Sequence, residues 1–166
     1  SIKGVGFIPR EEYAHELLEI FLRHINAGWR KGHTEQGLAL LAQTIYGDEG
    51  RKRLDFAKLG SLELARKHTW ANVLAEPKAT LLFYEPPSLS YEVRCRVEVH
   101  REGLYHALIN AMHDVYHKPD PSRWPERPAY IFIIEEIYDN SAVPQGFGRK
   151  IYPVERGSQE DFPRGE

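Results

Sequence analysis

The most constraining feature of this 166-residue chain is a strict alternation of side chains over residues 91–99. Charged residues alternate there with the apolar series Tyr91, Val93, Cys95, Val97 and Val99. Because neighbouring side chains of a β-strand point to opposite faces, this period of two predicts a half-buried antiparallel strand. Residues 79–85 (ATLLFYE) predict a partner strand, since the short break at 86–88 favours a hairpin. We expect Val93, Cys95 and Val97 to be buried, with Arg94 and Arg96 on the other face.

Helical periodicity marks three further segments. A proline, two acids and apolar residues at helical spacing predict a helix from Pro9 to Gly28. Residues 61–76 fit a second helix, which must stop before Pro77, and residues 104–117 fit a third. The apolar run at 37–45 (GLALLAQTI) leaves two alternatives open, because it suits either a buried strand or a helical turn.

Composition excludes several classes of protein. A net charge of −2 provides no basic surface for nucleic acid or an anionic membrane, so we expect neither partner. No apolar run approaches the roughly 20 residues of a membrane span, and the N-terminus lacks the layout of a signal peptide. The one cysteine excludes an internal disulfide, which fits a reducing compartment. We therefore expect a cytoplasmic protein.

The segment at 65–100 (ARKHTWANVLAEPKATLLFYEPPSLSYEVRCRVEVH) has a distinctive order of features. A basic pair, a short helix, a proline and an apolar strand are followed by a break and a strand that carries arginines. That order resembles the FMN-binding split-barrel family that includes pyridoxamine-phosphate oxidase. Pro77 matches the family's helix-ending proline, and Arg94 with Arg96-Val97-Glu98 matches its second strand. The resemblance spans residues 47–138; the family's first hairpin and the oxidase's C-terminal signature are not matched.

The resemblance implies a binding site for the phosphate of FMN. Arg66 and Lys67 match the family's phosphate-binding pair, and Lys58 and Ser61 lie where further phosphate contacts would come from. Arginine offers a phosphate a bidentate fork, and a nearby helix N-terminus adds its dipole. On pattern alone, Arg66 and Lys67 are better explained as two solvated charges on a surface helix, and the surrounding order of elements makes the two interpretations about equal.

The resemblance also implies a fold and an activity. With the predicted elements, it indicates an α+β fold: a small antiparallel β-barrel of the split-barrel type, flanked by helices and preceded by an N-terminal helix. We expect one domain over 1–166, with an N-terminal helical segment at about 1–32, the barrel domain at 33–154 and a mobile tail at 155–166. The implied activity is that of a flavin-dependent oxidoreductase with a small-molecule substrate or electron donor; no catalytic residue can be assigned.

A second copy of the chain is the expected protein partner. The family analogy implies a homodimer, with FMN in the groove between subunits. The chain also carries nine Tyr, seven Phe and three Trp, side chains that are enriched at interfaces.

Three histidines form a second candidate constellation. His106, His113 and His117 share one face of the helix predicted at 104–117, opposite its apolar stripe. Histidines four residues apart can chelate a metal ion, and Asp114 lies nearby. Because the apolar stripe should face the core, we expect these histidines on a solvated face and assign no metal site. A metal or haem site at the three histidines remains an alternative.

Other functional classes stay open. A non-catalytic binding or regulatory module of the same fold is the first alternative. Residues 30–41 (RKGHTEQGLALL) loosely resemble the acyl-CoA loop of N-acetyltransferases, a distant third because Gly32 and Gly37 stand too far apart. Cys95 lies in the apolar series of its strand, which indicates a buried small side chain and not a nucleophile.

Overall fold

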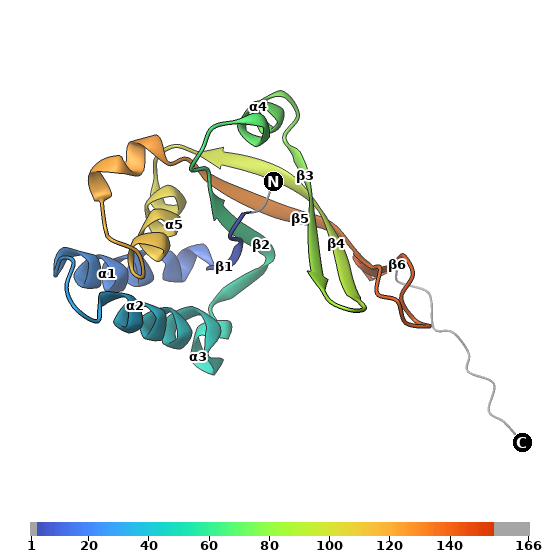
Figure 1. Ribbon diagram of the computed structural model, residues 1–166, viewed down its shortest axis with the longest axis horizontal. Helices are drawn as coiled ribbons and strands as arrows, with labels where there is room; N and C mark the ends of the chain where they lie inside the picture. The colour runs from blue at the N-terminus through green and yellow to red at the C-terminus, as the bar shows by residue number, and fades with distance from the viewer. Residues whose placement is uncertain (1–2, 155–166) are drawn as a thin grey trace, which may run out of the picture. The chain divides into compact units, whose positions relative to one another are not determined.

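The computed structural model describes residues 3–154 (Figure 1). Its elements in chain order are β1 (Gly6–Pro9), α1 (Glu11–Asn26), α2 (His33–Leu41), the π-helical turn η1 (Ala42–Tyr46), α3 (Asp48–Arg51), β2 (Leu54–Leu62), α4 (His68–Ala75), β3 (Lys78–Glu85), β4 (Leu89–His100), α5 (Leu104–Asp114), the 3-10 helix η2 (Pro121–Glu126), β5 (Ala129–Asp139) and β6 (Arg149–Tyr152). Within these residues the strands form one sheet in the order β1-β2-β5-β4-β3, and β6 also pairs with β5. The predicted fold class, α+β with a small antiparallel sheet flanked by helices, is confirmed. The tail predicted at 155–166 lies outside the described residues.

The described chain divides into two compact units. Residues 3–79 and 96–133 form the first unit, which holds all the helices of the described chain together with β1 and β2. Residues 80–95 and 134–154 form the second, which holds most of β3, β6 and parts of β4 and β5. The domain boundaries expected at residues 32 and 154 stay a prediction.

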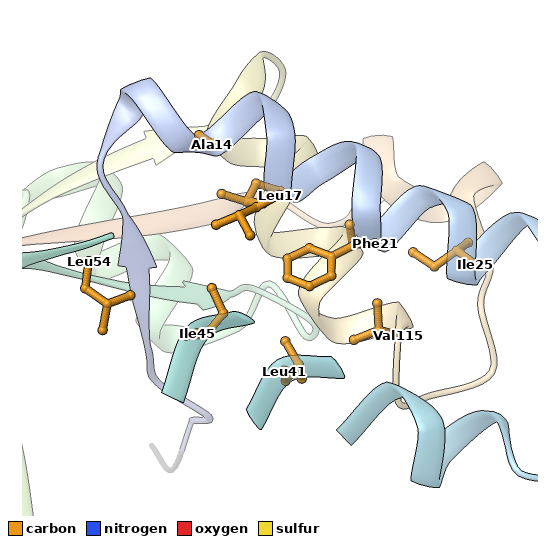
Figure 2. Packing of buried hydrophobic residues seen from close by; sticks show 10 residues of the cluster. Ala14, Leu17, Phe21, Ile25, Leu41, Ile45, Leu54 and Val115 are labelled. Atoms are coloured by element: carbon orange, nitrogen blue, oxygen red, sulfur yellow. The ribbon is translucent and has the colours of Figure 1, made fainter. Parts of the chain in front are cut away.

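Helix α1 and helix α5 form the main core of the first unit. The buried stripe of α1 consists of Ala14, Leu17, Phe21 and Ile25, the residues whose helical spacing predicted this helix. Figure 2 shows Phe21 among Leu17, Leu41 and Val115. Each such apolar side chain contributes about 1.5–3 kcal/mol when it is removed from water. This packing fixes α5, which carries part of the site described below.

The ambiguous run at 37–45 is helical. Gly37, Leu41 and Ile45 lie four residues apart and are all buried, which is the spacing of one helix face. Gly37 also lies against the end of α5: a Cβ atom at this position would stand 1.7 Å from the carbonyl oxygen of Val115. Through this buried face, α2 and η1 pack against α1 and α5. The alternative of a buried strand at 37–45 is therefore wrong.

The helix predicted over residues 61–76 begins later than expected, so the prediction is wrong for residues 61–67. Strand β2 continues through Ser61 and Leu62, because these residues pair with Tyr130 and Ala129 of β5. The helix begins seven residues later, at His68. Of the apolar residues expected on its buried face, Val73 is buried, Ala65 and Leu74 are exposed, and Leu62 is buried in the strand instead.

Arg66 and Lys67 consequently precede helix α4. They lie in the turn at 63–67, where Arg66 adopts a φ of +47° and Lys67 is the residue that precedes the first helical turn. A positive φ is uncommon for a residue with a side chain and marks a turn that its surroundings hold in place. Periodicity does not reveal this turn, because the apolar residues within it continue the helical spacing by coincidence.

The predicted hairpin is confirmed. Strands β3 and β4 are neighbours in the sheet and are joined by residues 86–88, a connection so short that the strands must run antiparallel (Figure 1). On β4, Val93, Cys95 and Val97 are buried, and Arg94 and Arg96 are exposed. Burial raises the pKa of the Cys95 thiol to about 11, so this side chain is a small core residue, as expected.

Candidate functional site

Two of the predicted phosphate-binding residues lie on opposite faces of β2. Ser61 is buried, and its hydroxyl donates a hydrogen bond of 2.7 Å to the carbonyl oxygen of Gly4. Lys58 is three residues away, an odd separation that turns a strand side chain to the other face. Its Nζ lies 3.1 Å from the carboxylate of Asp55. The structure therefore does not bring Lys58 and Ser61 together.

Arg66 and Lys67 are exposed in the turn before α4. The Arg66 guanidinium lies 5.7 Å from the ring centroid of Trp70, and one of its nitrogens lies 3.4 Å from the carbonyl oxygen of Pro125. The second contact is long for a hydrogen bond, so this side chain is held loosely.

An apolar cavity of about 500 Å³ opens beside Ser61. It lies between β1, the end of β2 and the C-terminal half of α5, and it is lined by Phe7, Ile8, Leu41, Ile109, Met112 and the rings of Tyr46, His113, Tyr116 and His117. Burial raises the pKa of Tyr46 and of Tyr116, so both phenols stay neutral hydrogen-bond donors. A largely apolar cavity of this size with a few polar atoms is typical of a small-molecule site.

A cationic cavity of about 520 Å³ adjoins the apolar one. It is lined by Leu64, Ala65, Arg66, His113, Arg123, Glu126 and Arg127, and it shares Leu64, Ala65 and His113 with the apolar cavity. Three guanidinium groups face one carboxylate there, which favours an anionic ligand. The pair of cavities therefore suits an elongated ligand with an aromatic body and an anionic end.

The turn that carries Arg66 is held by the buried carboxylate of Glu63. One oxygen accepts hydrogen bonds from the backbone N–H groups of Ala65 (2.8 Å) and Arg66 (2.7 Å). The other accepts from Lys3 Nζ at 2.9 Å and from the hydroxyl of Tyr130 at 2.8 Å. Burial alone raises the pKa of this carboxyl, but the donors, Lys3 foremost, outweigh it and lower the pKa to about 2. Glu63 thus fixes the backbone from which Arg66 projects.

A second buried carboxylate, Asp114, organises the other side of the cationic cavity. It accepts four hydrogen bonds, from His113 Nδ1 (2.9 Å), Arg127 (2.9 Å), Trp124 Nε1 (2.9 Å) and the backbone N–H of Asp120 (3.0 Å). Burial raises its pKa, yet the hydrogen bonds from His113 and Trp124 prevail and lower the pKa to about 2. Asp114 therefore remains ionised and ties the loop after α5 to the helix.

This arrangement orients His113 toward the cavities. An ionised carboxylate can only accept hydrogen bonds, so the proton of His113 is on Nδ1. The nitrogen left for a ligand is Nε2, on a ring that lines both cavities. His117, one turn further on, has its ring 4.4 Å from that of His113, and burial together with the neighbouring His113 lowers its pKa.

The histidine face that was expected to be solvated is solvated only in part: His117 is exposed and His113 is half-buried, but His106 is not exposed. His106 is buried and its Nε2 donates to the carbonyl oxygen of Trp124 at 3.0 Å, while Asn110, one turn along, donates to the carbonyl oxygen of Arg127. The loop that ends in η2 covers this face, which is why the helix is buried on two sides. Among the described residues no three His, Cys, Asp or Glu side chains are grouped to hold a metal ion. The alternative of a metal or haem site at these histidines stays a prediction.

Because Glu63 and Asp114 are buried and ionised, we expect the folded chain to lose stability in acid. The pKa of each is lower in the folded chain than in the unfolded chain, so their stabilising effect is complete above about pH 5 and is lost as the pH falls toward 2. We expect each to account for on the order of 2–3 kcal/mol of the free energy of unfolding at pH 7. Urea unfolding at pH 7, 5 and 3 measures the loss. Glu63→Gln should flatten the pH dependence, and an equally steep profile in that variant would contradict the assignment.

The residues that sequence analysis missed are Glu63, Arg127 and Trp124. Each becomes part of the site through a contact distant in sequence: Glu63 with Tyr130, and Arg127 and Trp124 with Asp114. The sequence contains one indication that a segment such as the one with Arg127 and Trp124 covers α5. The polar residues His106, Asn110 and Asp114 recur every four positions, which indicates a second buried helix face as well as a solvated one.

No family model and no curated protein matches the sequence. The 1.70 Å crystal structure of tagged HupZ from Group A Streptococcus aligns over 58% of this chain and 70% of its own, with 17% sequence identity and a TM-score of 0.47. This partial likeness does not carry a function from one protein to the other. Within the described residues, no helix is both long and apolar enough to cross a membrane.

Proposed function

We propose that the chain binds FMN, with the isoalloxazine ring in the apolar cavity and the phosphate in the cationic cavity beside Arg66. The observation that carries this proposal is the adjacency of the two cavities, which share His113, Leu64 and Ala65 and differ in chemistry as the two ends of FMN do. The cavity residues, apolar side chains on one side and guanidinium groups on the other, thus fit this cofactor.

Arg66 is the arginine best suited to the phosphate. Arg127 is committed to the buried Asp114, and Arg123 forms an ion pair of 3.4 Å with Glu126. Arg66 has its long contact to Pro125 and its position over Trp70, so its planar fork can turn to a phosphate at little cost. Lys67 follows directly at the positive end of the α4 dipole, where an anion is favoured.

The chain's own residues bind and orient in this scheme. FMN, when bound, supplies the hydride exchange with a small-molecule substrate or electron donor. Leu41, Ile109 and Met112 exclude water from the cavity, and Glu63 holds the turn of Arg66 in place. His113, fixed by Asp114, presents Nε2 as the hydrogen-bonding atom for the edge of the ring.

Haem is a second candidate, favoured by one observation. His113 has the arrangement of a metal-binding histidine backed by a carboxylate, and it stands between an apolar cavity and a cationic one. In this alternative His113 Nε2 would ligate the iron and the arginines would bind the propionates. The same side chains would thus serve a different cofactor.

Titration of the purified chain separates these proposals. FMN, riboflavin and haemin are each titrated against the protein, with flavin or tryptophan fluorescence and the absorption spectrum as readouts. We expect saturable binding of FMN and at least about a hundredfold weaker binding of riboflavin, which lacks the phosphate. Binding of haemin alone would support haem, and binding of neither would contradict the cofactor proposal. Reduction of bound FMN by a small electron donor would distinguish an oxidoreductase from a binding module.

A further inference from the structure

Two arginines from distant parts of the chain lie over one tryptophan ring. Trp70 is in the first turn of α4, and the guanidinium of Arg66 lies 5.7 Å from the centroid of its ring. Arg101, in the turn between β4 and α5, places its guanidinium 5.1 Å from the same centroid. Both arginines are exposed and Trp70 is half-buried. The indole thus gathers two positive charges at one place on the surface of the first compact unit.

Carboxylates do not neutralise this pair of charges. Within residues 3–154, neither Arg66 nor Arg101 forms an ion pair with an acidic side chain. The other arginines that lie over aromatic rings in the same residues each pair with glutamate: Arg10 with Glu12, Arg53 with Glu16, and Arg94 with Glu92 and Glu136. Like charges over one ring repel each other, and an anion between them removes that repulsion. The pair over Trp70 therefore favours an anionic ligand.

The cationic cavity connects this pair to the site described above. Arg66 lines that cavity, whereas Arg101 and Trp70 lie outside its lining. A single phosphate in the cavity neutralises Arg66 and leaves Arg101 without a counter-charge. A ligand with two consecutive phosphoryl groups can bind both arginines, because the two guanidinium groups lie over the same ring.

We propose that Arg101, Arg66 and Trp70 form a subsite for the second phosphoryl group of a nucleotide that carries a diphosphate. Guanidinium groups bind phosphoryl oxygens through paired hydrogen bonds, and the half-buried indole offers a base an aromatic surface on which to stack. ADP carries this chemistry alone, and FAD carries it joined to a flavin. The flavin part of this inference rests on the proposed function; the diphosphate part rests on the two arginines.

Calorimetric titration with ADP and AMP tests the subsite without a flavin. At physiological salt, which screens distant charges, we expect ADP to bind the parent at least about tenfold more tightly than AMP, because only ADP has the second phosphoryl group. Arg101→Ala should remove this preference. Arg94→Ala is the matched control and should keep it, since Arg94 also lies over an aromatic ring but is neutralised by two glutamates. Equal binding of ADP and AMP by the parent, no saturable binding of ADP at millimolar concentration, or an equal loss in both variants would overturn the inference.

Titration with FAD and FMN separates this inference from the proposed function. We expect the parent to bind FAD at least about tenfold more tightly than FMN, and Arg101→Ala to bind the two alike. If FMN binds but neither FAD nor ADP gains from its second phosphoryl group, the proposed function stands and the subsite is wrong. If ADP is preferred to AMP through Arg101 but neither flavin binds, the subsite stands and the flavin proposal is wrong. Circular dichroism of both variants confirms that the fold is retained.

Discussion

Replacement of Arg66 and Lys67 together by alanine should lower the affinity for FMN at least about a hundredfold. Charge-assisted hydrogen bonds to a phosphate contribute about 1.5–3 kcal/mol each, and two of them amount to that factor. Both side chains are exposed, so the fold should not change. Riboflavin, which lacks the phosphate, should bind the parent and the variant alike. Fluorescence titration of both ligands against both proteins measures the difference.

A second basic pair in the chain supplies the control. Arg51 and Lys52 are also adjacent and exposed, and their replacement by alanine removes the same charge. FMN binding should be unaffected in this control variant. If the two double variants lose affinity equally, the loss reflects net charge and Arg66 and Lys67 are solvated charges only. If neither loses affinity, the phosphate lies elsewhere.

Asp114→Asn should produce the largest loss of stability of any single substitution considered for this chain. The carboxylate accepts four hydrogen bonds at full burial, two of them from His113 and Arg127. An asparagine oxygen cannot accept all four, and the guanidinium of Arg127 would be left buried without its counter-charge. Breaking a buried ion pair from one side costs about 3–5 kcal/mol. Urea unfolding at pH 7 measures the change.

The exposed Asp48 provides the comparison for this substitution. Asp48→Asn removes the same charge from the first turn of α3 and should cost less than about 1 kcal/mol. An effect of similar size from both substitutions would show that Asp114 contributes no more than a surface charge. In that case His113 would have no fixed orientation toward the cavities.

Local periodicity predicted the parts of the fold whose burial pattern is regular. Alternation placed Val93 and Cys95 in the core and Arg94 outside, and helical spacing placed Leu17 and Phe21 on the buried face of α1. In both elements one face is apolar and the other polar, so the period identifies the structure without knowledge of neighbours.

The site depended on contacts that no local pattern contains. The turn at 63–67 exists because Glu63 is held by Tyr130 and Lys3, residues distant in sequence, and this is why a helix was wrongly predicted there. Likewise, His106 and Asp114 form a polar helix face that is buried only because the loop with Trp124 folds over it. Periodicity distinguishes apolar from polar faces, but it cannot show that a polar face is covered.

A nuclear magnetic resonance titration of the isotope-labelled chain with FMN tests the central claim most directly. Backbone amide signals report which residues surround a bound ligand. Saturable shifts at residues 60–66, 109–117 and 123–127, with the changes at 123–127 weaker for riboflavin, are the result that the two adjoining cavities predict. Saturable shifts confined to other residues, or no shifts at millimolar FMN, would contradict the site.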